Sequence, residues 1–166
     1  MSRRLLAFIA MLTIVGAGSA TGCTGSGDDA YSAKQLRTGE VVSVTSLKGK
    51  PAILVSWATW CRNCDEELAR LQEFESSEAS DGISVVAVNL DAASVEDEID
   101  AKIERHGLTV ELWRDQTNDF KRHFGALGVP TTVLLDVNGD VVQSFPGVVD
   151  FDDPEVAAAL KKANGA

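Results

Sequence analysis

Two cysteines, Cys61 and Cys64, stand between an apolar segment, residues 52–57, and a segment with helical periodicity, residues 62–76. The apolar segment carries no charge, which predicts a strand buried on both faces of a sheet. The cysteines would then lie where a strand ends and a helix begins. Unpaired N–H groups and the helix dipole stabilise a thiolate at that position. The pattern therefore predicts a redox-active dithiol rather than a structural bridge.

The rest of the chain alternates segments of strand and helix character. Strands are expected at residues 40–44, 52–57, 83–90, 110–113, 132–136 and 140–145, and helices at residues 62–76, 95–106, 118–124 and 154–163. Strand–helix–strand units give parallel strands, whereas Asn138-Gly139 predicts an antiparallel hairpin between the last two strands. Ser94 is the expected N-cap of the second helix, and Gly107 is expected to end it. The order predicts an α/β fold with a mixed central β-sheet, helices on both faces and an N-terminal β extension.

The first residues have the features of an export signal. Arg3 and Arg4 supply positive charge, and residues 5–15 form an apolar stretch of 11 residues, too short to span a bilayer as a helix. Ala20-Thr21-Gly22-Cys23 then resembles a bacterial lipobox, although Ala stands at a position that usually holds Leu. This resemblance implies lipidation of Cys23 and anchoring of an exported protein to a membrane.

The number of cysteines favours lipidation over plain secretion. The chain has three, and because Cys61 and Cys64 pair naturally, Cys23 is the odd one. Cleavage after Ala20 is the alternative, and it would give a secreted soluble protein with a free thiol. Residues 24–30 are mainly Gly, Ser and Asp, which is typical of a flexible tether. The expected division is a signal peptide (residues 1–22), a lipidated cysteine with its tether (residues 23–34) and one domain (residues 35–166).

The charge balance excludes one class of partner. The formal net charge is −10 at pH 7, and an acidic protein is a poor candidate for nucleic-acid binding. The expected domain is long enough for a single hydrophobic core. We expect a monomer without a nucleic-acid partner.

Several motifs together resemble a known family. Residues 56–64, Ser-Trp-Ala-Thr-Trp-Cys-Arg-Asn-Cys, resemble the active-site signature of thioredoxin-fold proteins. Residues 47–51, residues 128–132 and the Asp136-x-x-Gly139 hairpin are similar to the exported TlpA/ResA-like branch. The resemblance covers roughly residues 35–147. It implies a thioredoxin-like fold and thiol–disulfide oxidoreductase activity, with no metal and no cofactor besides the redox-active Cys61–Cys64 disulfide.

The resemblance also implies a client-binding region. In the family, the proline matching Pro130 is cis and lies against the dithiol, and its neighbours pair with the extended substrate segment. Val129 and Thr131 are therefore expected to bind substrate, together with Trp60. Trp57 and Trp60 are expected to pack around the dithiol, although Trp57 could instead belong to the core.

Glu67 matches an acidic residue that contributes to the active site in ResA-like proteins. The alternative is a solvated residue on a charged helix face. Thioredoxin has a buried Asp where this chain has Val55, which makes Glu67 the better candidate for proton transfer. Relatives usually have Pro before the second cysteine, whereas this chain has Arg62-Asn63. Arg62 could lower the pKa of Cys61, but we prefer the interpretation that its side chain points into water.

The expected mechanism assigns the attack to Cys61 and the resolution of the mixed disulfide to Cys64. The resemblance favours reduction of client disulfides over oxidation. It implies a membrane redox partner that recycles the dithiol, and clients in cytochrome c maturation or copper-site assembly.

Two other functions use the same cysteines. A copper-binding metallochaperone could hold Cu(I) between Cys61 and Cys64, although neither His106 nor His123 has ligand spacing to them. A peroxidase is the third possibility, but the chain has Leu54 where peroxiredoxins would place a Pro.

Overall fold

The computed structural model describes residues 30–165. The signal peptide, the lipid attachment at Cys23 and most of the tether fall on residues 1–29 and lie outside the described part. Within residues 30–165, no helix is both long and apolar enough to cross a membrane.

A seven-stranded mixed sheet forms the centre of the domain, with the strand order β2-β1-β5-β4-β3-β6-β7. Its strands are β1 (Ser32–Gln35), β2 (Val41–Ser43), β3 (Ala52–Trp57), β4 (Ser84–Asn89), β5 (Glu111–Arg114), β6 (Thr131–Leu135) and β7 (Val141–Pro146). Strands β3, β4 and β5 are parallel, and the remaining pairs are antiparallel. The expected mixed sheet and terminal hairpin are confirmed.

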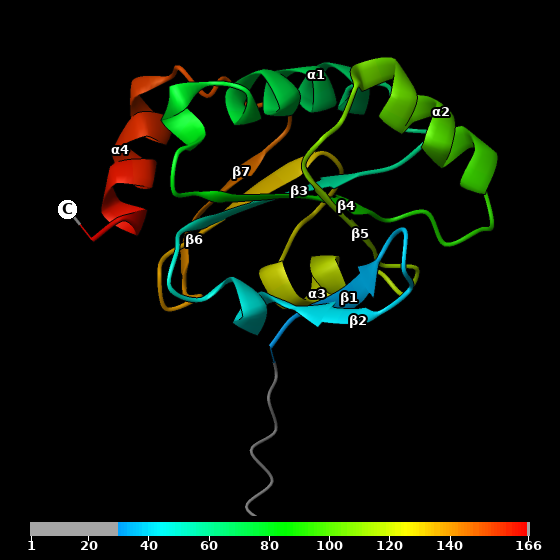
Figure 1. The fold of residues 1–166 in the computed structure, drawn as a ribbon, viewed down its shortest axis with the longest axis horizontal. Coiled ribbons are helices and arrows are strands. Elements are labelled where there is room, and N and C mark those ends of the chain that lie inside the picture. The colour runs from blue at the N-terminus through cyan, green and yellow to red at the C-terminus, as the bar shows by residue number, and fades with distance from the viewer. Residues whose placement is uncertain (1–29, 166) are drawn as a thin grey trace, which may run out of the picture.

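Helices cover both faces of the sheet (Figure 1). The four α-helices are α1 (Cys64–Glu75), α2 (Glu96–His106), α3 (Asp119–Phe124) and α4 (Pro154–Ala163), and short 3-10 helices are η1 (Val44–Leu47) and η2 (Glu78–Ser80). Helices α1 and α2 lie side by side on one face, while α3 lies on the other. Ile53 and Val55 of β3 pack toward α1, α2 and α4, whereas Leu54 packs with Phe120 of α3. Alternation along one strand thus creates both halves of the core.

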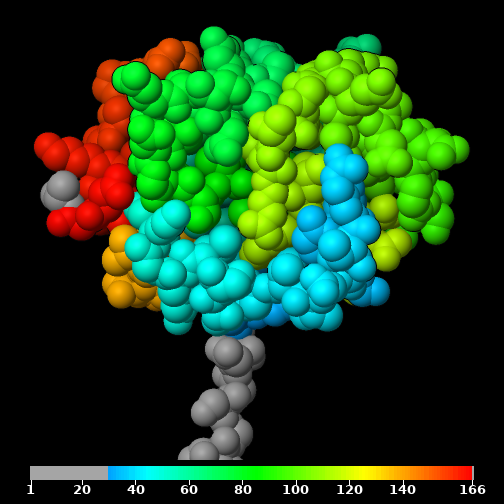
Figure 2. Space-filling view, in the orientation of Figure 1, coloured from blue at the N-terminus to red at the C-terminus, as the bar shows by residue number. Residues whose placement is uncertain are grey.

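The first strand begins before the expected domain boundary at residue 35. Strand β1 pairs with β2 and also with β5, so it extends the sheet beyond the parallel strands. In the space-filling view, the blue N-terminal hairpin packs against the yellow-green segment that contains β5 (Figure 2). Tyr31, just before β1, is buried against the ring of Phe120. The last residues of the expected tether therefore belong to the folded domain.

The predicted C-terminus of α2 is confirmed, whereas the predicted N-cap is wrong. Gly107 ends the helix in the left-handed conformation, with φ at 57°, as glycine allows. Ser94 was expected to cap its N-terminus, but the N-cap position is Val95 and no side chain caps this end. Acidic residues in the first turn, Glu96, Asp97 and Glu98, favour this end through the helix dipole instead.

Candidate active site

Cys61 and Cys64 form a disulfide at the start of α1. Cys64 is the first residue of the helix, and Cys61 lies in the turn that connects it to β3. Cys64 is fully buried, whereas 6% of the Cys61 surface is exposed. This order of exposure suits an accessible attacking sulfur and a protected resolving sulfur. Arg62 is exposed, in agreement with the interpretation that its side chain points into water.

A second loop approaches the dithiol from the start of β6. The Val129–Pro130 peptide bond is cis, as the resemblance implied. The Val129 carbonyl oxygen lies 3.6 Å from the Cys61 sulfur. Thr131 is buried, and both its N–H and its carbonyl oxygen are hydrogen-bonded to the Ser56 hydroxyl. Thr131 therefore holds this loop to β3, while Val129 lies against the reactive sulfur.

The two tryptophans before the dithiol have different environments. Trp57 is fully buried in the apolar cluster that also contains both cysteines, so it is at once a core residue and a neighbour of the dithiol. Trp60 is 68% exposed. An indole in water beside a reactive disulfide is available to a partner.

Glu67 is buried, so the interpretation as a solvated surface residue is wrong. Its carboxylate accepts hydrogen bonds from the Thr132 hydroxyl, at 2.8 Å, and from the Val149 N–H, at 2.7 Å. Burial raises the pKa of Glu67, and these two hydrogen bonds offset only part of that effect. Glu67 lies one helical turn after Cys64, on the same side of α1. A buried carboxyl group with a raised pKa near a reactive group is suited to proton transfer.

Asp91, which no motif in the sequence singles out, anchors the turn before the dithiol. Its buried carboxylate accepts hydrogen bonds from the Thr59 N–H at 2.8 Å and the Thr59 hydroxyl at 2.9 Å. The Asn89 side chain donates a third at 2.7 Å. An Asp directly after a buried strand was the available signal, because carboxyl ends of parallel strands meet at one edge of the sheet.

A buried lysine, Lys102, is likewise singled out by no sequence motif. Lys102 of α2 donates hydrogen bonds to the Cys61 carbonyl oxygen, at 3.2 Å, and to Asp65, at 3.1 Å. His106 contacts the same carboxylate at 2.9 Å, whereas His123 is exposed. The signal was its spacing: Ile99, Lys102, Ile103 and His106 recur at the period of one helix face.

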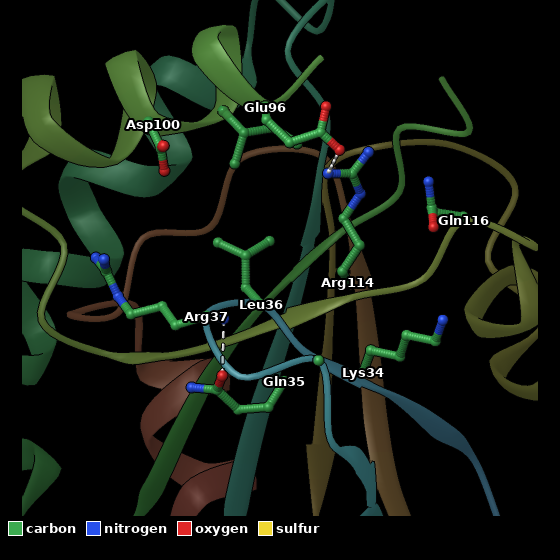
Figure 3. A pocket seen from close by; sticks show the side chains of 10 residues that line it. Lys34, Gln35, Leu36, Arg37, Glu96, Asp100, Arg114 and Gln116 are labelled. Atoms are coloured by element: carbon green, nitrogen blue, oxygen red, sulfur yellow. Dashed lines mark hydrogen bonds and ion pairs between the residues drawn. The ribbon is translucent and has the colours of Figure 1, made fainter. Parts of the chain in front are cut away.

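A hollow with a volume of about 410 Å³ lies away from the dithiol, between β1, β5 and the first turn of α2. Figure 3 shows Arg114 reaching toward Glu96 at its edge, with a separation of 3.5 Å. The lining carries charges of both signs. None of its lining residues belongs to the dithiol, the Pro130 loop or Glu67. This hollow is therefore separate from the candidate active site around the dithiol.

The sheet order, the dithiol at the start of α1 and the cis proline opposite it define a thioredoxin-like protein. More particularly, the sequence profile of the AhpC/TSA family matches residues 27–144, and the chain belongs to this family. The expected resemblance to ResA-like proteins is confirmed by the relatives. Thiol-disulfide oxidoreductase ResA from Geobacillus thermodenitrificans is 31% identical over 110 residues, which cover 66% of this chain and 62% of that protein. The chain spans less than two thirds of the length of several ResA relatives.

Two solved structures of other proteins share the fold of this chain. Thiol:disulfide interchange protein DsbE from Chlorobium tepidum has a TM-score of 0.69 at 25% identity, over 81% of this chain and 92% of that chain. The exposed lipoprotein thioredoxin Etrx1 from Streptococcus pneumoniae has a TM-score of 0.63 at 26% identity, over 80% and 98% of the two chains.

Proposed function

We propose that this chain is a thiol–disulfide oxidoreductase that exchanges its Cys61–Cys64 dithiol with disulfides of client proteins. The observation that carries the proposal is the placement of the Cys61 sulfur. Cys61 is the more exposed of the two cysteines, and its sulfur lies 3.6 Å from the Val129 carbonyl oxygen, beside Pro130. ResA and DsbE, which this chain resembles, are named for thiol–disulfide exchange. The Cys61–Cys64 pair itself donates two electrons as a dithiol and accepts two as a disulfide, so the reaction needs no further cofactor.

The reducing direction takes two steps. The Cys61 thiolate attacks one sulfur of a client disulfide, which forms a mixed disulfide and releases the other client sulfur as a thiolate. Cys64 then attacks the Cys61 sulfur, which closes the Cys61–Cys64 disulfide and releases the second client sulfur. Two electrons pass from the dithiol to the client, which leaves with two reduced sulfurs.

Glu67 is the proposed proton acceptor for Cys64. The buried Cys64 thiol must lose a proton before it can attack, and Glu67 lies one turn further along the same helix. Its partner Thr132 is paired across the sheet with Val55, the position at which thioredoxin has its buried Asp. The Glu67 carboxyl group, although it comes from the helix, would therefore serve the role of the buried Asp that thioredoxin has on the strand.

Client contact falls to residues around the Cys61 sulfur. Trp60 is exposed and offers apolar area, and Val129 offers its backbone next to the sulfur. Pro130 is buried, and its carbonyl oxygen accepts a hydrogen bond from the Gly147 N–H, so it would shape the loop at the client site. Thr131, with its backbone groups already bonded to Ser56, supports the loop from inside.

We further propose that the protein acts outside the cytoplasm as a reductant, tethered to a membrane through lipidated Cys23. The sequence before residue 30 supports this placement, and the similar Etrx1 is an exposed lipoprotein. A membrane protein would return electrons to the dithiol, and clients would be cysteine pairs of cytochrome c maturation or copper-site assembly. Labelling of cells with a radioactive fatty acid, with Cys23→Ser as the control, tests the anchor.

The first experiment is the reduction potential of the dithiol. The purified chain carrying Cys23→Ser is equilibrated with thiol redox buffers, and tryptophan fluorescence reports the oxidised fraction. A potential near or below about −270 mV supports a reductant, whereas one near about −120 mV overturns that direction.

The two alternative functions are tested on the same reduced protein, to which hydrogen peroxide and Cu(I) are added in separate assays. Rapid peroxide turnover, or copper binding without disulfide exchange, would replace the proposed function with one of the alternatives.

A further inference from the structure

Lys102 is a buried cation in contact with the residue that carries the attacking sulfur. Only 7% of its surface is exposed, and it lies between the buried Ile99 and Ile103 on α2. Lysine is almost never buried unless it is paired. Here its Nζ donates to the Cys61 carbonyl oxygen at 3.2 Å and to Asp65 Oδ2 at 3.1 Å.

Asp65 neutralises this cation only in part, because it is shared. Its carboxylate also faces His106 Nε2 at 2.9 Å and the exposed Arg105 Nη1 at 3.7 Å. Burial acts to raise the pKa of Asp65, but the hydrogen bonds and charges of His106 and Lys102 outweigh it, so the pKa lies below its ordinary value. The Asp65 side chain is 39% exposed and that of Lys102 only 9%, so water screens the carboxylate more than the ammonium.

Three other charged residues of the described part lie near the contact between Lys102 and Cys61 in space or in sequence: Glu98, Arg62 and Glu67. Glu98 lines the same hollow as Trp60 and Lys102, which has a volume of about 390 Å³. Arg62 is exposed, and Glu67 bonds toward β6 rather than toward α2. Lys102 is therefore the buried charge that directly contacts Cys61.

We propose that Lys102 is a positioning residue of the dithiol, whose ammonium fixes the Cys61 carbonyl group and favours the Cys61 thiolate over the thiol. The contact acts in two ways. The hydrogen bond holds the turn that presents the sulfur to Val129. After reduction, the Cys61 sulfur carries negative charge, and a nearby cation lowers the pKa of such a group. A stabilised thiolate also raises the reduction potential of the pair, because the reduced form is favoured.

The test is the pKa of Cys61 in reduced protein that carries Cys23→Ser and Cys64→Ala, so that Cys61 is the remaining thiol. The pKa is read from the pH dependence of thiolate ultraviolet absorption and of alkylation by iodoacetamide. Lys102→Met keeps the length of the side chain and removes the charge. It is expected to raise the pKa of Cys61 by about one unit. Arg105→Met removes an exposed cation that also faces Asp65, and no shift is expected for this matched control.

A second variant separates charge from structure. Asp65→Asn removes the carboxylate and leaves Lys102 uncompensated, so the pKa of Cys61 should fall. Opposite shifts in Lys102→Met and Asp65→Asn support the proposal. Shifts in the same direction, or none in proteins with native near-ultraviolet circular dichroism, overturn it. If Lys102→Met does not fold, Lys102→Gln takes its place, and the shifts that Lys102→Gln and Asp65→Asn cause in the pKa of Cys61 are compared in the same way.

The potential gives an independent readout on the intact dithiol. Lys102→Met should lower the reduction potential relative to Arg105→Met, and an unchanged potential would count against the proposal. The role of Lys102 rests on the proposed function in one respect: the Cys61 thiolate is the group that attacks client disulfides. Lack of exchange with protein disulfides would defeat the proposed function, yet the pKa of Cys61 would still decide the role of Lys102.

Discussion

The Thr132 hydroxyl donates a hydrogen bond of 2.8 Å to the Glu67 carboxylate, which joins residues 65 positions apart in the chain. The bond connects α1, which begins with the dithiol, to β6, which follows the Pro130 loop. Glu67 is thereby held in the core one turn from Cys64. Its second hydrogen bond comes from the Val149 N–H, so the carboxylate also ties down the segment after β7.

Glu67→Gln should slow disulfide exchange. The amide keeps the shape of the side chain but cannot accept the proton of Cys64, so we expect a rate loss of roughly a hundredfold near neutral pH. The measurement is the pH dependence of reduction of a protein disulfide. Glu66→Gln, an exposed neighbour on the same helix, is the control. Equal rates for the two variants would remove Glu67 from the mechanism.

The same substitution should change how stability depends on pH. Burial raises the pKa of Glu67 above its ordinary value of about 4.5, so the folded protein binds this proton more tightly than the unfolded chain. The free energy of unfolding should therefore fall as pH rises from the ordinary pKa through the raised one. Urea unfolding at several pH values should show that Glu67→Gln lacks this decline. An identical slope in wild type and variant would contradict a raised pKa.

Cys64→Ser should trap the intermediate of the reaction. In protein that also carries Cys23→Ser, Cys61 can still attack a client disulfide, but no second thiol is present to resolve the mixed disulfide. Non-reducing gels should show a covalent complex that a reductant dissolves. Cys61→Ser should form none, and a complex with Cys61→Ser alone would reverse the assigned roles.

Asp91→Ala should destabilise the domain. It leaves the Thr59 N–H, the Thr59 hydroxyl and the Asn89 amide without their acceptor. Hydrogen bonds to a buried charge are strong, so we expect a loss of about 2 to 3 kcal/mol in the free energy of unfolding. Urea unfolding gives this value, with the exposed Asp81→Ala as reference. A difference below about 0.5 kcal/mol, the usual range for surface substitutions, would show that Asp91 is not an anchor.

Trp60→Ala should weaken client binding without loss of stability. Trp60 is 68% exposed, so removal of its ring leaves no cavity. We expect kcat/KM for a protein disulfide to fall about fivefold or more, which corresponds to roughly 1 kcal/mol. Reduction of a small-molecule disulfide should be unaffected, because such a substrate is too small to contact Trp60 while it reacts with Cys61. A parallel loss for both substrates would instead assign Trp60 to the chemistry.

The sequence by itself determined the parts that local patterns encode. The Cys61–Cys64 pair between an uncharged strand and a helix, and the Asn138-Gly139 turn, each carry their signal within a few neighbouring residues. The apolar run of residues 52–57 likewise became β3 with its expected bounds. Only the tertiary structure placed β1, because a four-residue strand is defined by its partners β2 and β5. It also decided the burial of Glu67 and the contact of Lys102 with Cys61. A charged residue looks the same in sequence whether it meets water or a hydrogen-bonding partner dozens of residues away, and packing alone makes that choice.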